Sequence, residues 1–118
     1  MPKEIKEKGV IIDLRNYPSS KKIKGYMNYE LLYPFSTNCA LATNGSLLHP
    51  GLFTFDQTSK VGKKNEEYYK GKKVILVNEF TQSHAEFTTM KYKQAPNAIV
   101  MGSTTAGADG NYSIITLV

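Results

Sequence analysis

The residues best suited to chemistry lie in Thr81-Gln82-Ser83-His84-Ala85-Glu86, which follows an apolar run and opens a segment of helical character. A serine at a junction of strand, short loop and helix exposes its hydroxyl beside free backbone N–H groups, which can bind an oxyanion. This position would suit a nucleophilic role for Ser83. The spacing of Ser83 and Glu86 is equally that of a capping box, in which the two side chains only satisfy the helix end. Spacing alone favours the cap, and the nucleophilic interpretation stays open.

Three short runs rich in β-branched residues, at 10–14, 74–77 and 98–101, predict the strands that position this loop. Their nearly continuous apolar character predicts burial on both faces of the sheet. A helix is predicted over residues 83–94, before Pro96, so that it connects the second run to the third as a βαβ unit. The predicted fold class is therefore α/β with a partly parallel sheet.

The region between the first two runs has a less regular pattern. Residues 21–32 have the spacing of a helix. Residues 35–57 predict extended, hairpin-like strands, within which Asn44-Gly45 is typical of a tight turn. Residues 59–73 are polar and rich in lysine, which predicts an exposed connection into the second run.

Three segments occur in a fixed order: KGVIIDLRNYP at residues 8–18, GKKVILVN leading into TQSHAE at residues 71–86, and GSTTAG at residues 102–107. This ordered set resembles the catalytic core of the C-terminal processing, or tail-specific, serine peptidases, whose relatives include tricorn protease and the interphotoreceptor retinoid-binding protein repeats. The resemblance covers most of the chain and implies a ClpP/crotonase-like core with flanking helices. It also implies that residues 1–118 form a single partial or complete peptidase core domain.

The resemblance assigns roles to the residues of the serine segment. Ser83 matches the nucleophile, and the backbone N–H of His84 matches one donor of the oxyanion hole. Glu86 matches a residue of the family motif that can also serve only as a helix cap. Such a site cleaves peptide bonds through an acyl-enzyme, here formed on Ser83.

The second oxyanion donor of the family comes from the turn after the first strand, where glycine is usual. In this chain that turn is Pro18 to Ser20. Because proline has no N–H, the resemblance leaves the backbone N–H of Ser19 or Ser20 as the donor.

The general base is where the chain departs from the family. Peptidases of the Ser-Lys type carry a lysine directly after the glycine of the third segment, and the residue after Gly107 is Ala108. Lys91 and Lys93 do not replace it, because eight or ten helical residues separate their backbones from Ser83 by roughly 12 to 15 Å. The tricorn-like branch uses a histidine from an earlier segment and a downstream acidic residue, and both could lie outside this chain.

Four other residues have chemical potential but a plainer interpretation. His84 adjoins Ser83, but neighbouring helical side chains diverge by about 100 degrees, and His49 precedes Pro50-Gly51 in a predicted turn. Asp13 closes a predicted strand, where a buried hydrogen-bonding role is more common than acid catalysis. Asp109 suits a turn, although it could orient a base from elsewhere.

Composition limits the classes of partner. The net charge of +5 comes from 15 basic and 10 acidic residues, but only one of the basic residues is arginine, and the lysines form small groups at predicted element ends. Since phosphate clamping and base readout favour arginine, we expect a solvated basic surface and no nucleic-acid partner. The single Cys39 cannot form an internal disulfide, and no metal-type spacing occurs, so neither metal nor cofactor is expected.

No run approaches the roughly 18 apolar residues that span a bilayer, and residues 1–8 lack the apolar stretch of a secretory signal. We therefore expect no membrane segment in this chain. The family resemblance favours an extracytoplasmic or cell-envelope setting.

The leading hypothesis is a serine peptidase core acting on peptides or proteins, as a segment of a longer protein whose isolated chain is weakly active or inactive. One alternative is a ligand- or peptide-binding module of the same fold in which Ser83 only caps its helix. A third is a crotonase-type acyl-CoA site, because that fold also builds oxyanion holes.

Overall fold

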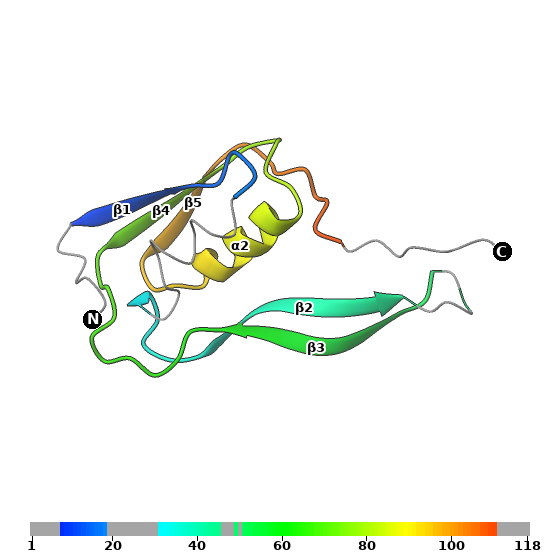
Figure 1. Cartoon of the computed structure of the whole chain (residues 1–118), viewed down its shortest axis with the longest axis horizontal. Coiled ribbons are helices and arrows are strands. Elements are labelled where there is room, and N and C mark those ends of the chain that lie inside the picture. The colour runs from blue at the N-terminus through cyan, green and yellow to red at the C-terminus, as the bar shows by residue number, and fades with distance from the viewer. Residues whose placement is uncertain (1–7, 19–30, 46–48, 50, 111–118) are drawn as a thin grey trace.

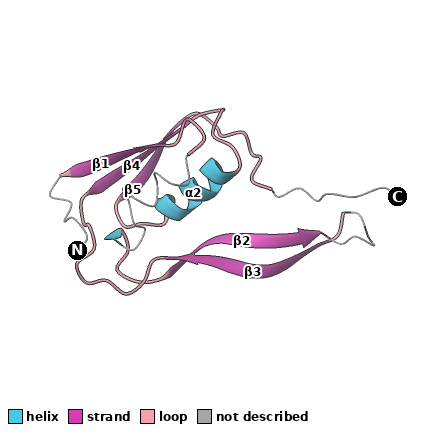
Figure 2. Cartoon of the chain, viewed as in Figure 1, coloured by secondary structure: helices cyan, strands magenta, loops and turns pink. Residues whose placement is uncertain are grey.

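The computed structural model describes residues 8–18, 31–45, 49 and 51–110. Its elements, in chain order, are β1 (Gly9–Asp13), β2 (Thr37–Gly45), β3 (Phe53–Val61), β4 (Lys72–Val77), α2 (His84–Lys93) and β5 (Ala98–Gly102). β1, β4 and β5 form one sheet with α2 on one face, and β2 and β3 form a hairpin beside it (Figure 1, Figure 2). The helix expected over residues 21–32 lies, up to residue 30, outside the described residues.

The three-stranded sheet is parallel throughout, with β4 in the centre. β4, α2 and β5 form the predicted βαβ unit, so the α/β class and the placement of the three runs in one sheet are confirmed. Parallel strands end at the same edge of a sheet. Here that edge carries the three loops that follow β1, β4 and β5, and the loop after β4 leads to Ser83.

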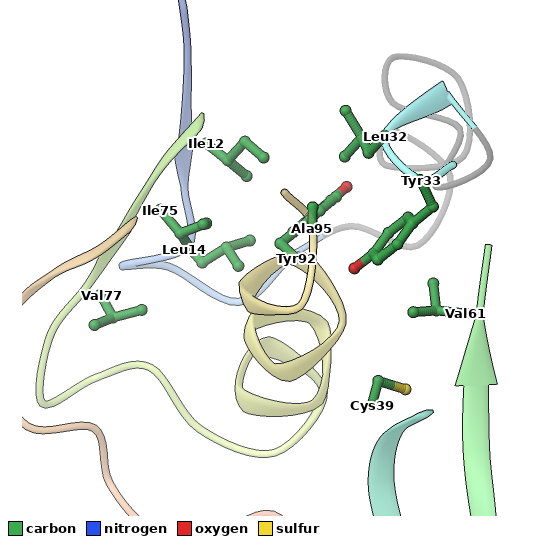
Figure 3. Packing of buried hydrophobic residues seen from close by; sticks show 10 residues of the cluster. All are labelled: Ile12, Leu14, Leu32, Tyr33, Cys39, Val61, Ile75, Val77, Tyr92 and Ala95. Atoms are coloured by element: carbon green, nitrogen blue, oxygen red, sulfur yellow. The ribbon is translucent and has the colours of Figure 1, made fainter. Parts of the chain in front are cut away.

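The core lies between α2 and the face of the sheet that α2 covers (Figure 3). Ile12 of β1, Ile75 of β4 and Tyr92 of α2 belong to one cluster of buried side chains. Cys39 of β2 and Val61 of β3 extend this cluster to the base of the hairpin. Tyr92 therefore packs the C-terminal half of α2 against the core, and the N-terminus of α2 follows the loop at the sheet edge.

The prediction that the sheet is buried on both faces is wrong. Ile11 is 71% exposed, and Ile99 and Met101 are each 53% exposed. Alternate side chains of a strand point to opposite faces, and among the described elements α2 covers only one of them. Continuous apolarity therefore failed to predict that the outer face is open in this structure.

The hairpin is confirmed, but its turn is not where the sequence placed it. Asn44 and Gly45 pair with Thr54 and Phe53, so both remain within β2, and the connection lies beyond Gly45. β3 also continues past the predicted end at residue 57, to Val61. The Asn44-Gly45 dipeptide forms part of a strand rather than a turn, because pairing with β3 satisfies the hydrogen-bonding groups of its backbone.

The predicted exposed connection over residues 59–73 is buried at both ends, since Val61 is 6% and Lys73 only 1% exposed. The Lys73 Nζ donates hydrogen bonds to the carbonyl oxygens of Tyr69 at 2.8 Å, Gly71 at 3.1 Å and Pro96 at 2.8 Å. Burial lowers the pKa of this ammonium group. The three carbonyls replace water around it, which makes burial at the start of β4 tolerable.

Candidate active site

β4 ends at Val77, and Ser83 is the N-cap residue of α2, at the junction of strand, loop and helix that the sequence predicted. Its backbone has φ 48° and ψ −120°. Positive φ is unfavourable for a residue with a side chain, and such a conformation costs about 1–3 kcal/mol. It persists only where the surrounding contacts fix it, and strained positions of this kind concentrate at active sites.

Glu86 supplies those contacts. Its Oε2 accepts from the Ser83 N–H at 3.0 Å, which is the carboxylate half of the predicted capping box. Beyond the cap, its Oε1 accepts from Thr105 Oγ1 and from the Gly107 N–H, both at 2.7 Å, and its Oε2 accepts from the Ala108 N–H at 2.9 Å. Glu86 therefore joins the start of α2 to the loop after β5, a role that the capping-box interpretation does not include.

The Glu86 side chain is buried, with the whole residue 8% exposed. Burial alone raises the pKa of its carboxyl group, but the hydrogen bonds from Thr105, Gly107, Ala108 and Ser83 outweigh it, and the pKa is lowered from 4.5. Glu86 is thus a carboxylate at neutral pH and accepts hydrogen bonds without donating any. Glu86 therefore holds the start of α2 and the loop after β5 together through accepted hydrogen bonds, and it does not act as a proton donor.

Thr81 connects the same loops through other atoms. The residue is fully buried. Its Oγ1 donates a hydrogen bond to the carbonyl oxygen of Leu14 at 2.8 Å and accepts one from the Asn78 N–H at 3.0 Å. Its carbonyl oxygen accepts from the Ala106 N–H at 3.0 Å. The ends of β1 and β4 and the loop after β5 therefore meet at this residue.

The turn after β1 lies against the start of α2. The rings of Tyr17 and His84 are 6.3 Å apart between centroids and tilted by 41°. Ser19 and Ser20 are outside the described residues, so their part in an oxyanion hole stays a prediction. Pro18, which has no N–H to donate, is half-buried next to Tyr17.

Asp13 and Arg15 form a pair at the end of β1. Arg15 Nη2 donates to Asp13 Oδ2 at 2.7 Å, and the Arg15 backbone N–H donates to Asp13 Oδ1 at 3.0 Å. These bonds lower the pKa of Asp13 to about 2. The expectation of a buried hydrogen-bonding role is correct for the bonds but wrong for burial, because the Asp13 side chain is 46% exposed. Asp13 points away from α2, on the open face of the sheet.

His84 and Asp109 interact electrostatically at the N-terminus of α2. The pKa of Asp109 is raised, first by burial of its carboxyl group and then by the charge of Glu86, while His84 acts to lower it. The roles considered for Asp109, as a turn residue or as an orienting residue for a base, remain predictions.

The other candidate bases belong to two different elements. His49 is in the connection between β2 and β3, at the opposite end of the hairpin from the Thr37 and Val61 pair. The Lys91 Nζ lies 4.3 Å from the ring centroid of Phe87, on its own helix.

Sequence reasoning missed the roles of Thr81 and Thr105. Both residues are in the segments that carry the resemblance, but their local patterns are those of ordinary loop threonines. Only proximity to Leu14 and Glu86, respectively, reveals what their hydroxyl groups bind.

Two further observations concern the described residues alone. None of their helices is long and apolar enough to cross a membrane. Nor do three or more of their histidine, cysteine, aspartate and glutamate side chains gather where they could hold a metal ion.

The model of peptidase family S41 matches residues 3–118 of the chain. The chain belongs to this family. The match confirms the resemblance to the C-terminal processing peptidases, and the parallel sheet with its helix agrees with the ClpP-like core expected of a family S41 domain. Comparisons with curated proteins and with solved structures give no match. Membership in family S41 makes this a domain of the serine peptidase type, with peptides or proteins as the implied substrates.

Proposed function

We propose that Ser83 is the nucleophile of a peptidase core that cleaves peptide bonds through an acyl-enzyme. The observation that carries this proposal is the strained backbone of Ser83, φ 48°, at the N-terminus of α2. A serine that only capped a helix would have no need of that conformation, because ordinary N-caps adopt the β region. The match to family S41 over residues 3–118 supports the same role.

The proposed oxyanion hole uses the backbone N–H of His84 and that of Ser19 or Ser20. The first-turn N–H groups of a helix lack intrahelical acceptors and lie at the positive end of its dipole, so they favour a developing negative charge. The contact of Tyr17 with His84 brings the turn after β1 to this end of α2. Both donors must converge to about 2.7–3.1 Å from one oxygen atom.

Proton transfer is the step for which the described part of the chain shows no evident residue beside Ser83. Ala108 occupies the place of the family lysine and cannot accept a proton. We therefore propose that the isolated chain, as a partial or complete core domain, acylates slowly and that the base is supplied by another segment. Cleavage directed by a substrate's C-terminus, as in tail-specific peptidases, belongs to the same proposal.

The second candidate function is a binding module that retains the fold and recognises peptides without cleaving them. The observation that favours it is the same Ala108. In that case Ser83 and Glu86 serve only to fix the start of α2.

A fluorophosphonate probe distinguishes the two functions. The probe phosphonylates an activated serine: the serine oxygen bonds to phosphorus, fluoride leaves and the hydroxyl proton is lost, and intact-protein and peptide mass spectrometry locate the adduct. We expect slow labelling at Ser83, none in Ser83→Ala, and unchanged labelling in the control Ser103→Ala, whose hydroxyl binds the exposed Glu79. Labelling that persists in Ser83→Ala would contradict the assignment of the nucleophile. An unlabelled chain that binds an unfolded protein substrate would favour the binding module.

Tail specificity has its own comparison. The comparison uses a form of the protein that cleaves peptides. It is given two peptides of the same sequence, one with a free C-terminal carboxylate and one with a C-terminal amide. Faster cleavage of the free carboxylate is expected, and equal rates would contradict this part of the proposal.

A further inference from the structure

We propose that Thr81 is a positioning residue, which sets the turn after β1, at residues 15–18, relative to the N-terminus of the nucleophile helix. The inference rests on the proposed function of Ser83. It is carried by the contacts of the Thr81 side chain and backbone with described residues.

The hydroxyl of Thr81 both donates and accepts a hydrogen bond. It donates its proton to the Leu14 carbonyl oxygen at 2.8 Å and accepts from the Asn78 N–H at 3.0 Å, in a position with no exposure to solvent. Leu14 and Thr81 are 67 residues apart in sequence. A buried hydroxyl with both functions used holds its partners in one arrangement, since each of them would otherwise be desolvated without a partner.

Leu14 is the point at which the first strand leaves the sheet. Its N–H still bonds to the Leu76 carbonyl oxygen, at 2.9 Å, as the last link to β4. Its own carbonyl bonds to Thr81. The chain then turns through residues 15–18, of which residues 15–17 are exposed, so the Thr81 hydroxyl is a buried hydrogen-bond partner at the start of that turn.

On the other side, Thr81 is two residues before Ser83. Its backbone carbonyl also accepts from the Ala106 N–H at 3.0 Å, which ties the loop after β5 to the same point. The other described contact between the turn and the helix is that of Tyr17 with His84, and Tyr17 is 62% exposed. An exposed ring contact constrains position less than a buried hydrogen bond does, so Thr81 has the larger share in setting the spacing.

Spacing matters because a displacement of about 1 Å at a reacting centre can cost 100-fold in rate. Loss of the Thr81 hydroxyl leaves the Leu14 carbonyl and the Asn78 N–H without their shared partner. We expect the turn after β1 to separate from α2, with His84 and Ser83 themselves unchanged in sequence and in helix capping.

The experiment compares Thr81→Val, which keeps the shape and loses the hydroxyl, with Thr81→Ser, which keeps the hydroxyl. The matched control is Thr89→Val, because Thr89 is also buried but its hydroxyl bonds within α2, to the Ala85 carbonyl at 2.8 Å. Thr81→Ala serves as a second variant should Thr81→Val fail to fold.

Two readouts are taken on the full chain. The first is geometric: nuclear Overhauser effects between the rings of Tyr17 and His84, which require no catalysis. The second is the reaction of Ser83 with the fluorophosphonate probe, separated into the maximal inactivation rate kinact and the half-saturation constant KI.

In Thr81→Val we expect the ring contacts to be lost and kinact to fall about 10- to 100-fold with KI unchanged. Thr81→Ser and Thr89→Val should match the wild-type chain in both readouts. A purely structural role would lower stability in Thr81→Val without a selective fall in kinact. Preserved ring contacts and an unchanged kinact in a folded Thr81→Val or Thr81→Ala would overturn the inference. If no form is labelled at Ser83 while the ring contacts still depend on the hydroxyl, the proposed nucleophile fails and the positional role of Thr81 remains.

Discussion

Ser83 and Ala108 donate their backbone N–H groups to the same oxygen atom, Oε2 of Glu86, at 3.0 and 2.9 Å. The first is the proposed nucleophile and the second stands where Ser-Lys peptidases of the family carry their base. Residue 108, where this chain has no basic side chain, is therefore close to the serine proposed as the nucleophile. Restoring the base at residue 108 is therefore a direct test of the site.

Ala108→Lys should gain reactivity at Ser83. A positioned general base contributes about 10²–10⁴-fold, so labelling by the fluorophosphonate probe should rise by a factor of that order. Ala108→Met is the control, because it has comparable length without an amine. The gain must disappear in the double variant Ala108→Lys, Ser83→Ala. Equal labelling of the lysine and methionine variants would mean that residue 108 does not face the hydroxyl.

Glu86→Gln should destabilise the fold. Each carboxylate oxygen of Glu86 accepts two hydrogen bonds, and an amide places an NH₂ group against two of these four donors. Unsatisfied buried donors lead us to expect a loss of about 1–3 kcal/mol in the free energy of unfolding at pH 7, measured by urea denaturation followed by circular dichroism. The control Glu79→Gln alters an exposed carboxylate bonded to Ser103 and should leave the urea midpoint unchanged. An unaltered midpoint in Glu86→Gln would show that these bonds add nothing to stability.

The stability that Glu86 provides should depend on pH. Its pKa in the folded chain is below the ordinary 4.5, so the folded state favours the carboxylate. The contribution is therefore fully present above pH 4.5 and is lost as the pH falls through the lower, folded-state pKa. Urea midpoints measured from pH 7 down to pH 3 should fall more steeply for the wild-type chain than for Glu86→Gln. Parallel curves for the two proteins would contradict the lowered pKa.

Asp13 should give a second loss of stability at acidic pH, which can be distinguished from that of Glu86. Its pKa is lowered from 3.8 to about 2 by Arg15, so its contribution is lost only below pH 3.8. Because the pair is half-exposed and screened by solvent, the effect should be small and should shrink in added salt. Asp13→Asn should flatten the urea midpoint curve only in that lowest range, and a change near pH 5 would contradict this assignment.

Gly102 and Gly107 both have positive φ, but substitution by alanine should reduce stability by different amounts at the two positions. At Gly102, φ is 134° and a Cβ would overlap the Val77 carbonyl oxygen, the backbone that it pairs with in the sheet. Gly102→Ala should therefore cost at least about 3 kcal/mol. At Gly107, φ is 68° and the space for a Cβ is open, so Gly107→Ala should cost only the left-handed conformation, about 1–2 kcal/mol. Equal thermal midpoints for the two variants would contradict the difference in packing.

The sequence by itself determined the elements and their order around Ser83. β4, α2 and β5 are predictable because β-branched runs, helical spacing and Pro96 act within a few residues of one another, and a parallel βαβ unit allows few alternatives. The serine segment and the third segment were recognisable for the same reason: their residues are close in the chain. The family resemblance, confirmed over residues 3–118, depends on such segments and on their order.

Tertiary structure decided which groups face each other and which face water. Nothing local distinguishes Ile11, which is exposed, from Ile12, which is buried; the difference arises because α2 covers one face of the sheet. Asn44 and Gly45 formed no turn because both pair with residues of β3 and remain within β2. Glu86 could be predicted as a cap, but its bonds to Thr105, Gly107 and Ala108 span about 20 residues, as the Thr81 bond to Leu14 spans 67. Such hydrogen bonds depend on how whole helices and strands pack together. Local helix and strand propensities, from which secondary structure is predicted, carry no information about that packing.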